Sequence, residues 1–397
     1  PRWYRRRQRQ MCIRDRLYVV EPTPSLTGAM ADHRLAMASS EIGQLARALA
    51  RQLGLAVTGA PNEQSAKWID AVAKDLEAHR GSSLILAGEH QPPAVHALAH
   101  AMNELLGSNG NTVLYIDPGV TSPEDVTSQS ESFRGLVDDM KAGRVDVLVI
   151  LDANPVYDAP ADFDFPALMD NVDFRVHLGQ YDDETAELCH WHIPQAHYLE
   201  SWGDIRAFDG TASIVQPLIE PLYGGKTPQE IMATLLGQPN RSGFSIVQDH
   251  WRRQSSDVSW ERALHDGLVP ESAFAPQSVS IQDGLDSRLP SPSTTAAGWE
   301  TVFRPDATVF DGRFANNGWL QELPRALTTL TWDNAALISP DAATELGLAN
   351  GDVVELAIQG RTVEAPVWVM PGQARNSVTL HLGYGRARAG KVGTGVG

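Results

Sequence analysis

Hydrophobic residues in the first part of the chain follow two different spacings. Segments in which apolar side chains recur every three or four positions predict amphipathic helices, and short runs that are apolar throughout predict strands buried on both faces. Ser39 or Ser40 is placed to cap the first helix. Such alternation is typical of an α/β domain with a parallel sheet and helices on both of its faces. In chain order the pattern predicts helix 40–55, strand 83–88, helix 93–106, strand 112–117, helix 133–142 and strand 145–151.

Polar residues follow the ends of the predicted strands. Glu89 and His90 come after the first strand, Asp117 after the second, and Asp152 and Asn154 after the third. In open parallel sheets, ligands bind beyond the carboxyl ends of the strands, where the loops leave a crevice. The sequence therefore predicts a binding edge at these residues.

The last part of the chain alternates apolar and polar residues between tight turns. It predicts half-buried strands over 351–358, 362–370 and 377–380. A small closed β-barrel would protect the edges of such strands. A stretch rich in Ser and Pro before it indicates a connector with short helices. The resulting division is a tail at 1–16, an α/β domain at 17–237, a connector at 238–305 and a β-barrel at 306–397.

Composition excludes several classes of protein. The chain has 397 residues, 42% of them hydrophobic, which allows roughly two or three domains with their own cores. No stretch of about 18 apolar residues without charge occurs, so the sequence predicts no direct membrane span. The formal net charge of −17 argues against nucleic acid, because binding to phosphates needs clustered Lys and Arg.

Sulfur ligands and catalytic motifs are scarce. Cys12 and Cys189 form no Cys-x-x-Cys pair, and an iron–sulfur cluster needs about four thiolates, so these residues cannot hold one by themselves. They also exclude a disulfide scaffold and a four-thiolate zinc site. No Gly-x-Ser-x-Gly, His-Glu-x-x-His, Walker or Gly-x-Gly-x-x-Gly string occurs. Hydrolase, metalloprotease, NTPase and simple dinucleotide dehydrogenase functions therefore have no support.

Two groups of histidines could suggest a metal site or a proton relay. Cys189, His190 and His192 are ligand types that zinc prefers, but on a strand Cys189 faces away from the two histidines. A buried, hydrogen-bonded strand end is the simpler interpretation. His96 and His100 lie one turn apart on a predicted helix, where a solvated helix face is the simpler interpretation. No metal ligand is therefore assigned.

Residues 1–16 differ in character from the rest. They contain seven arginines without an apolar period, and 11–16 look like translated sequencing-adapter sequence. We interpret this tail as non-native, and a basic segment for nucleic acid or a membrane surface is the alternative. No signal-peptide pattern follows, and the chain ends at Gly397 in an expected loop. We expect an internal fragment of a longer protein.

An ordered set of short motifs resembles the large subunit of molybdopterin oxidoreductases. The resemblance implies a Rossmann-like domain followed by a β-barrel of the double-psi type, which belongs to the dinucleotide-binding domain of these enzymes. The motifs are Asn154-Pro155, Glu184-Thr185-Ala186, His192-Ile193-Pro194, Tyr198-Leu199-Glu200, Asn317-Gly318-Trp319, Trp332-Asp333-Asn334, Gly351-Asp352-Val353 and Pro371-Gly372.

Three sequence segments indicate a more specific resemblance within this family. They are 189–194, 200–204 and 381–386. They look like the molybdopterin-like half of the fused iron–sulfur subunit of alternative complex III, a quinol-oxidising respiratory complex. The resemblance implies that this half lacks the metal cofactor and that iron–sulfur clusters lie in a second half beyond Gly397. It also implies partners among the subunits of a membrane-bound complex, at the periplasmic face of a bacterial inner membrane.

The resemblance further implies where a pterin dinucleotide would lie. Asp152, Asn154, Thr185, Glu200 and Gly203 fall where the enzymes of the family hold it, at strand ends facing a crevice. The metal-ligating residue of the enzymes lies upstream of this segment, and acidic side chains suit a phosphate-rich cofactor badly. We therefore expect a vestigial cleft closed by side chains, without catalytic residues.

Three functions remain open. The first is a cofactor-free scaffold that holds an adjoining iron–sulfur domain and neighbouring subunits of an electron-transfer complex. The second is an active molybdenum or tungsten oxidoreductase, in which the intact protein binds molybdopterin dinucleotide. The third is a free-standing α/β protein that binds a small molecule at the strand ends.

Overall fold

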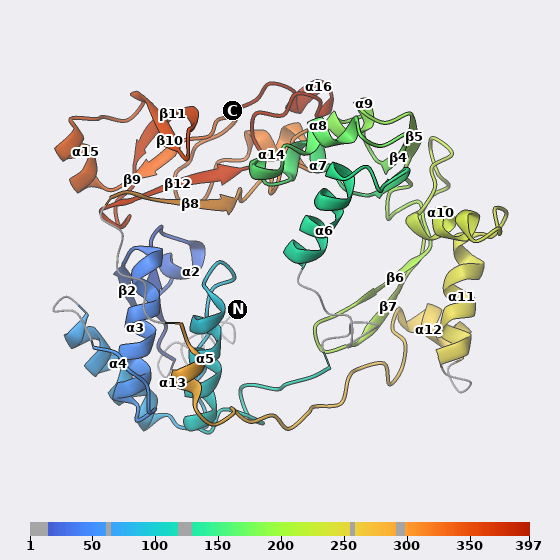
Figure 1. Cartoon of the computed structure of the whole chain (residues 1–397). Helices are drawn as coiled ribbons and strands as arrows, with labels where there is room; N and C mark the ends of the chain where they lie inside the picture. The colour runs from blue at the N-terminus through green and yellow to red at the C-terminus, as the bar shows by residue number, and fades with distance from the viewer. Residues whose placement is uncertain (1–14, 61–64, 118–128, 255–258, 291–297) are drawn as a thin grey trace, which may run out of the picture.

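The computed structural model describes residues 15–60, 65–117, 129–254, 259–290 and 298–397, so residues 1–14 of the tail lie outside the described part. None of the described helices is long and apolar enough to cross a membrane. Figure 1 shows four regions, which we call the N-terminal lobe (15–117), the parallel-sheet region (129–197), the hairpin lobe (198–266) and the C-terminal sheet region (298–397).

The N-terminal lobe packs three helices around one hydrophobic core, in which Leu98 and Met102 are almost fully buried. Helices α3 and α5 confirm the helices predicted from the apolar spacing. Strands β1 and β2 pair in parallel beside them. The elements are β1 (Tyr18–Glu21), α2 (Leu26–Ala29), β2 (His33–Ala36), α3 (Ser39–Gln52), α4 (Ala66–Ala78) and α5 (Pro93–Leu105).

Helix α3 is capped from another region of the chain. Its N-cap residue is Ala38, which makes no side-chain cap, so the serine cap predicted from the sequence is wrong. The carboxylate of Glu300, on strand β8 (Glu300–Pro305), accepts hydrogen bonds from Ser39 N at 2.6 Å and Ser40 N at 2.8 Å. It thereby pairs two amides that lack a helical acceptor and lies at the positive end of the helix dipole.

The strands predicted at 83–88 and 112–117 are wrong, because neither segment forms a ladder among the described residues. Ile85 N donates to Asn103 Oδ1 at 2.9 Å, and Asn103 Nδ2 donates to the Ile85 carbonyl at 2.8 Å. The amide side chain of Asn103 thus satisfies backbone groups that would otherwise bond a neighbouring strand. The second segment makes only isolated bridges at Val113 and Tyr115.

The parallel-sheet region holds three parallel strands in the order β3-β4-β5. Strand β3 confirms the strand predicted at 145–151. Helices α6 and α8 pack on it through a core that includes Val137 and Met140, both 0% exposed. Its elements are α6 (Gln129–Lys141), β3 (Val147–Leu151), α7 (Pro155–Asp158), η2 (Ala161–Phe163), α8 (Phe165–Met169), β4 (Phe174–Gly179), α9 (Glu184–Glu187) and β5 (Trp191–Pro194).

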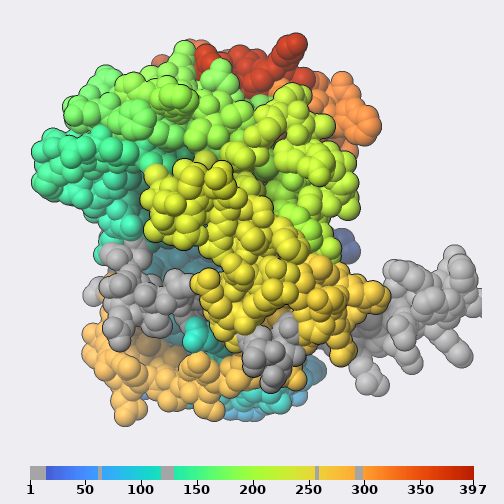
Figure 2. All heavy atoms as spheres, turned by 90° about the vertical axis from the view of Figure 1, so that its right-hand side faces the viewer, coloured from blue at the N-terminus to red at the C-terminus, as the bar shows by residue number. Residues whose placement is uncertain are grey.

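The hairpin lobe packs helices against the antiparallel pair β6 and β7 around the buried Trp251 and Trp260. The segment expected as a connector, 238–305, contains short helices, but its last residues form strand β8 of the C-terminal sheet. Leu285 and Leu289 from this segment pack against the core of the N-terminal lobe. Figure 2 shows this later segment, in orange, lying below the hairpin lobe. The elements are β6 (Gly203–Arg206), β7 (Ala212–Val215), α10 (Pro228–Leu235), α11 (Gly243–Gln254), α12 (Trp260–Asp266) and α13 (Leu285–Arg288).

The C-terminal region is a mixed five-stranded sheet in the order β10-β11-β9-β12-β8. The last three strands occur where the alternating pattern predicts them. No pairing in the described part joins β10 to β8, so the closed double-psi barrel is not confirmed. The further elements are α14 (Gly318–Glu322), β9 (Ala336–Ile338), α15 (Pro340–Leu346), β10 (Val353–Ile358), β11 (Arg361–Val369), β12 (Ser377–Leu382) and α16 (Gly390–Gly393).

This sheet also contacts the N-terminal lobe beyond the α3 cap. The hydroxyls of Thr23 and Thr379 share a hydrogen bond, and Ala374 N donates to the Pro22 carbonyl at 2.7 Å. Both contacts join the end of strand β1 to the turn before β12 or to β12 itself. The C-terminal sheet therefore fixes the position of the first lobe.

We predict that Glu300→Ala destabilises the protein by about 1–2 kcal/mol, because two amides of α3 lose their acceptor. Glu300→Gln keeps a neutral acceptor and should cost about half as much. Urea unfolding measures both changes. Glu345→Ala is the matched control. The side chains of Glu345 and Arg375, which form an ion pair, are 53% and 61% exposed, so this pair contributes little to stability. A loss in Glu300→Ala no larger than in the control would contradict the assignment of the cap.

Candidate functional site

The carboxyl ends of β3, β4 and β5 meet at one edge of the parallel sheet, which we call the strand-end edge. Asp152 follows β3 with a left-handed φ of 55°, and its amide donates to the Leu178 carbonyl of β4 at 2.9 Å. This turn brings Asn154 beside the loop after β4. In that loop, Asp183 Oδ1 accepts a bond from Thr185 N at 3.1 Å and starts helix α9.

Asn154 and Thr185 connect the two loops directly. Thr185 Oγ1 donates to Asn154 Oδ1 at 2.7 Å, and Thr185 N reaches the same oxygen at 3.2 Å. Val156 N in turn donates to Thr185 Oγ1 at 3.1 Å. Thr185 is 0% exposed, so its hydroxyl both donates and accepts inside the protein. Two of the predicted site residues are therefore in contact, with their hydrogen bonds directed at each other.

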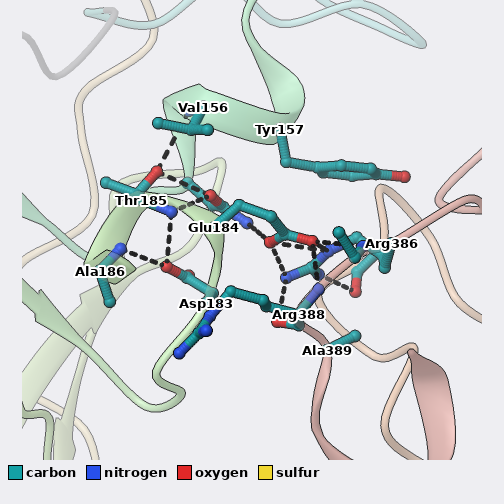
Figure 3. A network of polar contacts seen from close by, with 12 residues as sticks. Val156, Tyr157, Asp183, Glu184, Thr185, Ala186, Arg386, Arg388 and Ala389 are labelled. Atoms are coloured by element: carbon teal, nitrogen blue, oxygen red, sulfur yellow. Dashed lines mark hydrogen bonds and ion pairs between the residues drawn. The ribbon is translucent and has the colours of Figure 1, made fainter. Parts of the chain in front are cut away.

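The carboxylate of Glu184 is the centre of the strand-end edge (Figure 3). Its Oε1 accepts from Arg386 Nε at 3.0 Å and from the backbone amides of Ala387 and Arg388, both at 2.9 Å. Its Oε2 accepts from Arg386 Nη2 at 2.7 Å and Asn154 Nδ2 at 2.8 Å. The side chains of Glu184 and Arg386 are only 10% and 8% exposed. A buried carboxylate is thus fully paired by donors from two distant segments.

Arg386 is held on every side. Nη1 donates to the Gly312 carbonyl at 2.7 Å, and the guanidinium lies 4.7 Å from the ring centroid of Tyr157. Tyr157 Oη donates to the Tyr384 carbonyl at 2.8 Å. Gly312 has a φ of +99°, and a Cβ there would lie 2.9 Å from the Tyr157 ring. Helix α7 and the segment after β12 therefore share one close-packed contact.

The pKa of Glu184 follows from these contacts. Burial alone raises the pKa, but the bonds from Arg386, from the Arg388 amide and from Asn154 outweigh it and lower the pKa to about 2. The carboxylate is therefore charged across the whole neutral range. The same pair raises the pKa of Arg386, although burial opposes that shift.

The structure does not bring all the predicted site residues together at one place. Asp152, Asn154 and Thr185 lie at the strand-end edge. Glu200 and Gly203 lie in the hairpin lobe, where Glu200 Oε2 accepts from His197 N at 3.2 Å and Gly203 begins strand β6. No contact recorded in the described residues joins these two to the edge. Their binding of a pterin stays a prediction.

The strand-end edge does not fit a pterin dinucleotide. The phosphates of such a cofactor need free donors, yet the donors of Asn154, Thr185 and Arg386 are all bonded inside the protein. The carboxylates of Asp152 and Asp183 add negative charge beside them, which disfavours a second anion. No step of a redox reaction is therefore assigned to this edge.

Two histidines near the sheet form a hydrogen-bonded pair, and the free thiol of Cys189 beside them is partly buried. His177, 1% exposed, places Nδ1 3.1 Å from His192 Nδ1 and Nε2 3.2 Å from the Ala153 carbonyl oxygen. Burial lowers the pKa of His177 and raises the pKa of Cys189 to about 11. Within the described ranges, no three His, Cys, Asp or Glu side chains are placed to hold a metal. Residues 189–192 lie at the start of β5 and His190 is hydrogen-bonded to Arg175, but Trp191 is 63% exposed, so the expectation that this strand end is buried is wrong.

Two important residues received no role in the sequence analysis. Arg386 lies in a segment that resembles the family, but the run Gly385-Arg386-Ala387-Arg388 does not reveal its buried partner. His177 lies in an apolar strand that the pattern did not single out. His100 was assigned to a solvated helix face, and its Nδ1 lies 2.8 Å from Tyr115 Oη. Only knowledge of the strand order would have placed Glu184 and Arg386 together.

Comparison with curated proteins finds distant relatives. The chain is 22% identical over 285 residues to the molybdopterin-containing subunit of thiosulfate reductase from Salmonella typhimurium, covering 60% of this chain and 37% of that protein. It is 23% identical over 269 residues to the molybdopterin-binding-like subunit of menaquinone reductase from Nitratidesulfovibrio vulgaris, covering 65% and 38%. The chain thus spans well under half the length of these relatives. No protein-family model matches it.

Among solved structures, the fold is similar to that of acetylene hydratase from Pelobacter acetylenicus. The match has a TM-score of 0.61 at 12% identity and covers 95% of this chain and 68% of that chain. At this identity the similarity shows the architecture alone. It supports the α/β fold class that the family resemblance implies, whereas a mixed sheet lies where the resemblance implies a double-psi barrel.

We predict that Glu184 makes stability depend on acid pH. Its pKa is about 2 in the folded protein against a usual 4.5, so its contribution is present above pH 4.5 and is lost as the pH falls toward 2. The shift corresponds to about 3 kcal/mol at most. Urea unfolding should therefore show a difference between wild type and Glu184→Gln that is largest at pH 6–7 and shrinks below pH 4.5.

Glu187→Gln is the control for this titration, because Glu187 lies on the same helix with a side chain 57% exposed. Its difference from wild type should stay near zero at every pH. If the Glu184→Gln difference does not change between pH 7 and pH 3, the lowered pKa of Glu184 is refuted.

Proposed function

We propose that this chain is part of the molybdopterin-type subunit of an oxidoreductase complex. The observation that carries the proposal is that both curated relatives are described as molybdopterin-type reductase subunits. Fold similarity over 95% of the chain supports the same architecture. The whole activity belongs to the proposal, since the chain spans only 37% and 38% of these relatives.

Within this class, the relatives favour a subunit that binds molybdopterin in the intact protein. One of them is named as molybdopterin-containing. In such a subunit the cofactor would supply the redox chemistry. The residues of the strand-end edge would supply the rigid frame beside it, because Arg386 donates to Glu184 and the Thr185 hydroxyl donates to Asn154.

A cofactor-free scaffold is the second candidate, and the strand-end edge favours it. There, Asn154, Thr185 and Glu184 are bonded to one another or to Arg386, and Arg388 Nε is a buried donor without a partner among the described residues. The thiol of Cys189, with its pKa raised to about 11, stays protonated at neutral pH and is a poor metal ligand. In this form the segment would hold an adjoining iron–sulfur domain in place.

The narrower identity rests on the motif resemblance. For the cofactor-free scaffold form, we propose a complex of the alternative complex III type, which oxidises quinol at the periplasmic face of a bacterial inner membrane and has iron–sulfur and other subunits as partners. The menaquinone reductase relative supports a link to quinones. A free-standing small-molecule binder has no comparable support.

The deciding experiment is metal and pterin analysis of the full-length natural protein in its purified complex. We expect stoichiometric molybdenum or tungsten, together with pterin detected by fluorescence after oxidation. Protein from a host that cannot make the pterin is the control and should contain neither. Quinol-dependent electron transfer by a complex that lacks both metal and pterin would refute the cofactor-binding form and establish the scaffold.

A further inference from the structure

Five donor groups converge on the Glu184 carboxylate in the arrangement of an anion receptor. They are the Nε and Nη2 of Arg386, the consecutive amides of Ala387 and Arg388, and the Asn154 side-chain amide. Consecutive backbone N–H groups make an anion-binding concavity, and an arginine fork matches a planar carboxylate. Four of these five donors come from three consecutive residues that lie some 200 positions away in the sequence from the anion they bind.

The donors are positioned by contacts that do not involve Glu184. Arg386 donates to the Gly312 carbonyl at 2.7 Å and to the Arg388 carbonyl at 3.3 Å, and it lies over the Tyr157 ring. Without Glu184, these donors would remain in place around a buried cation with no counter-ion. A buried, unpaired charge is strongly destabilising, so the site would require another anion.

The receptor suits a planar monoanion better than a phosphate. Each oxygen accepts three hydrogen bonds, with Arg386 Nε shared between the two, which uses the two oxygens of a carboxylate fully. Arg388, at the rim, is engaged by Asp182 at 2.5 Å and Glu187 at 3.3 Å. These rim carboxylates would repel the extra charge of a phosphate dianion.

We propose that the strand-end edge is a carboxylate receptor that the protein fills with its own Glu184. In this role the side chain takes the place of a ligand. It fastens the segment after β12 to the loops after β3 and β4, and it keeps other anions out of the edge. The inference is independent of the proposed function, because it concerns no metal or pterin.

Chemical rescue tests the proposal in the full chain. Glu184→Ala should lower Tm by roughly 4–6 °C, as expected for breaking a buried ion pair in a chain of this length. Sodium acetate should then raise Tm again with a saturating dose dependence, by about 2 °C at tenfold its Kd. Sodium chloride at the same ionic strength and neutral acetamide should not, and inorganic phosphate should act more weakly than acetate.

Two variants serve as controls for the rescue. Glu184→Gln is also destabilised but fills the space, so acetate should not rescue it. Glu187→Ala removes an exposed carboxylate from the same helix and should not respond to acetate. The proposal is overturned if acetate leaves Glu184→Ala unchanged, or raises the Tm of wild type or of Glu187→Ala by as much.

If Glu184→Ala does not fold with or without acetate, a double variant tests the proposal instead. Asn154→Asp alone places two carboxylates together and should lower Tm. Asn154→Asp combined with Glu184→Gln moves the negative charge to the neighbouring position, where the new carboxylate can accept from both the glutamine amide and Arg386. The double variant should melt above both single variants. A Tm below either of them would overturn the receptor.

Discussion

A buried carboxylate is stable only when its oxygens are fully paired, and the pairing of Glu184 determines how this chain is assembled. Removing a carboxylate and a guanidinium from water costs several kcal/mol for each ion, which close and complete hydrogen bonding must offset. Glu184 meets this requirement with donors from Asn154 and from 386–388. Those two segments must therefore keep their places whenever the carboxylate is buried. The geometry of the strand-end edge follows from that constraint.

The C-terminal sheet region is where the separate lobes are joined. It reaches the parallel-sheet region through Arg386 and reaches the N-terminal lobe through Glu300 and Thr379. These contacts are buried or partly buried except for the exposed bond from Ser40 N to Glu300, and each provides an acceptor or donor that the other region lacks. The exposed pair of Arg361 with Asp162 also connects regions, but solvent screens it, so it adds little. The regions are thus joined by hydrogen bonds between polar groups that would lack a partner within their own region.

The sequence predicts those parts of the fold that depend on near neighbours. The helices α3 and α5 and the strands β3 and β10 to β12 follow from apolar spacing, because burial of one face is a local property. The strand expected at 83–88 fails because Ile85 finds its partner in the side chain of Asn103, which no periodicity reveals. Asn154 and Thr185 were found through resemblance, and they do meet. The pairing of Glu184 with Arg386 spans too much sequence to be read from either motif.

At the strand-end edge, the fold provides a crevice, but individual side chains determine what occupies it. The parallel strand order places loops together at their carboxyl ends and so offers the same crevice to any chain with this architecture, here at 12% identity to a solved structure. What fills the crevice depends on a few charged side chains. In this chain those side chains, Glu184 and Arg386, form an ion pair with each other. A phosphate-rich ligand would have to displace Glu184, whose pKa of about 2 shows how strongly its ionised form is held. Similarity of fold therefore indicates where a cofactor could lie, whereas the hydrogen bonds of Asn154, Thr185 and Glu184 decide that this edge is already occupied.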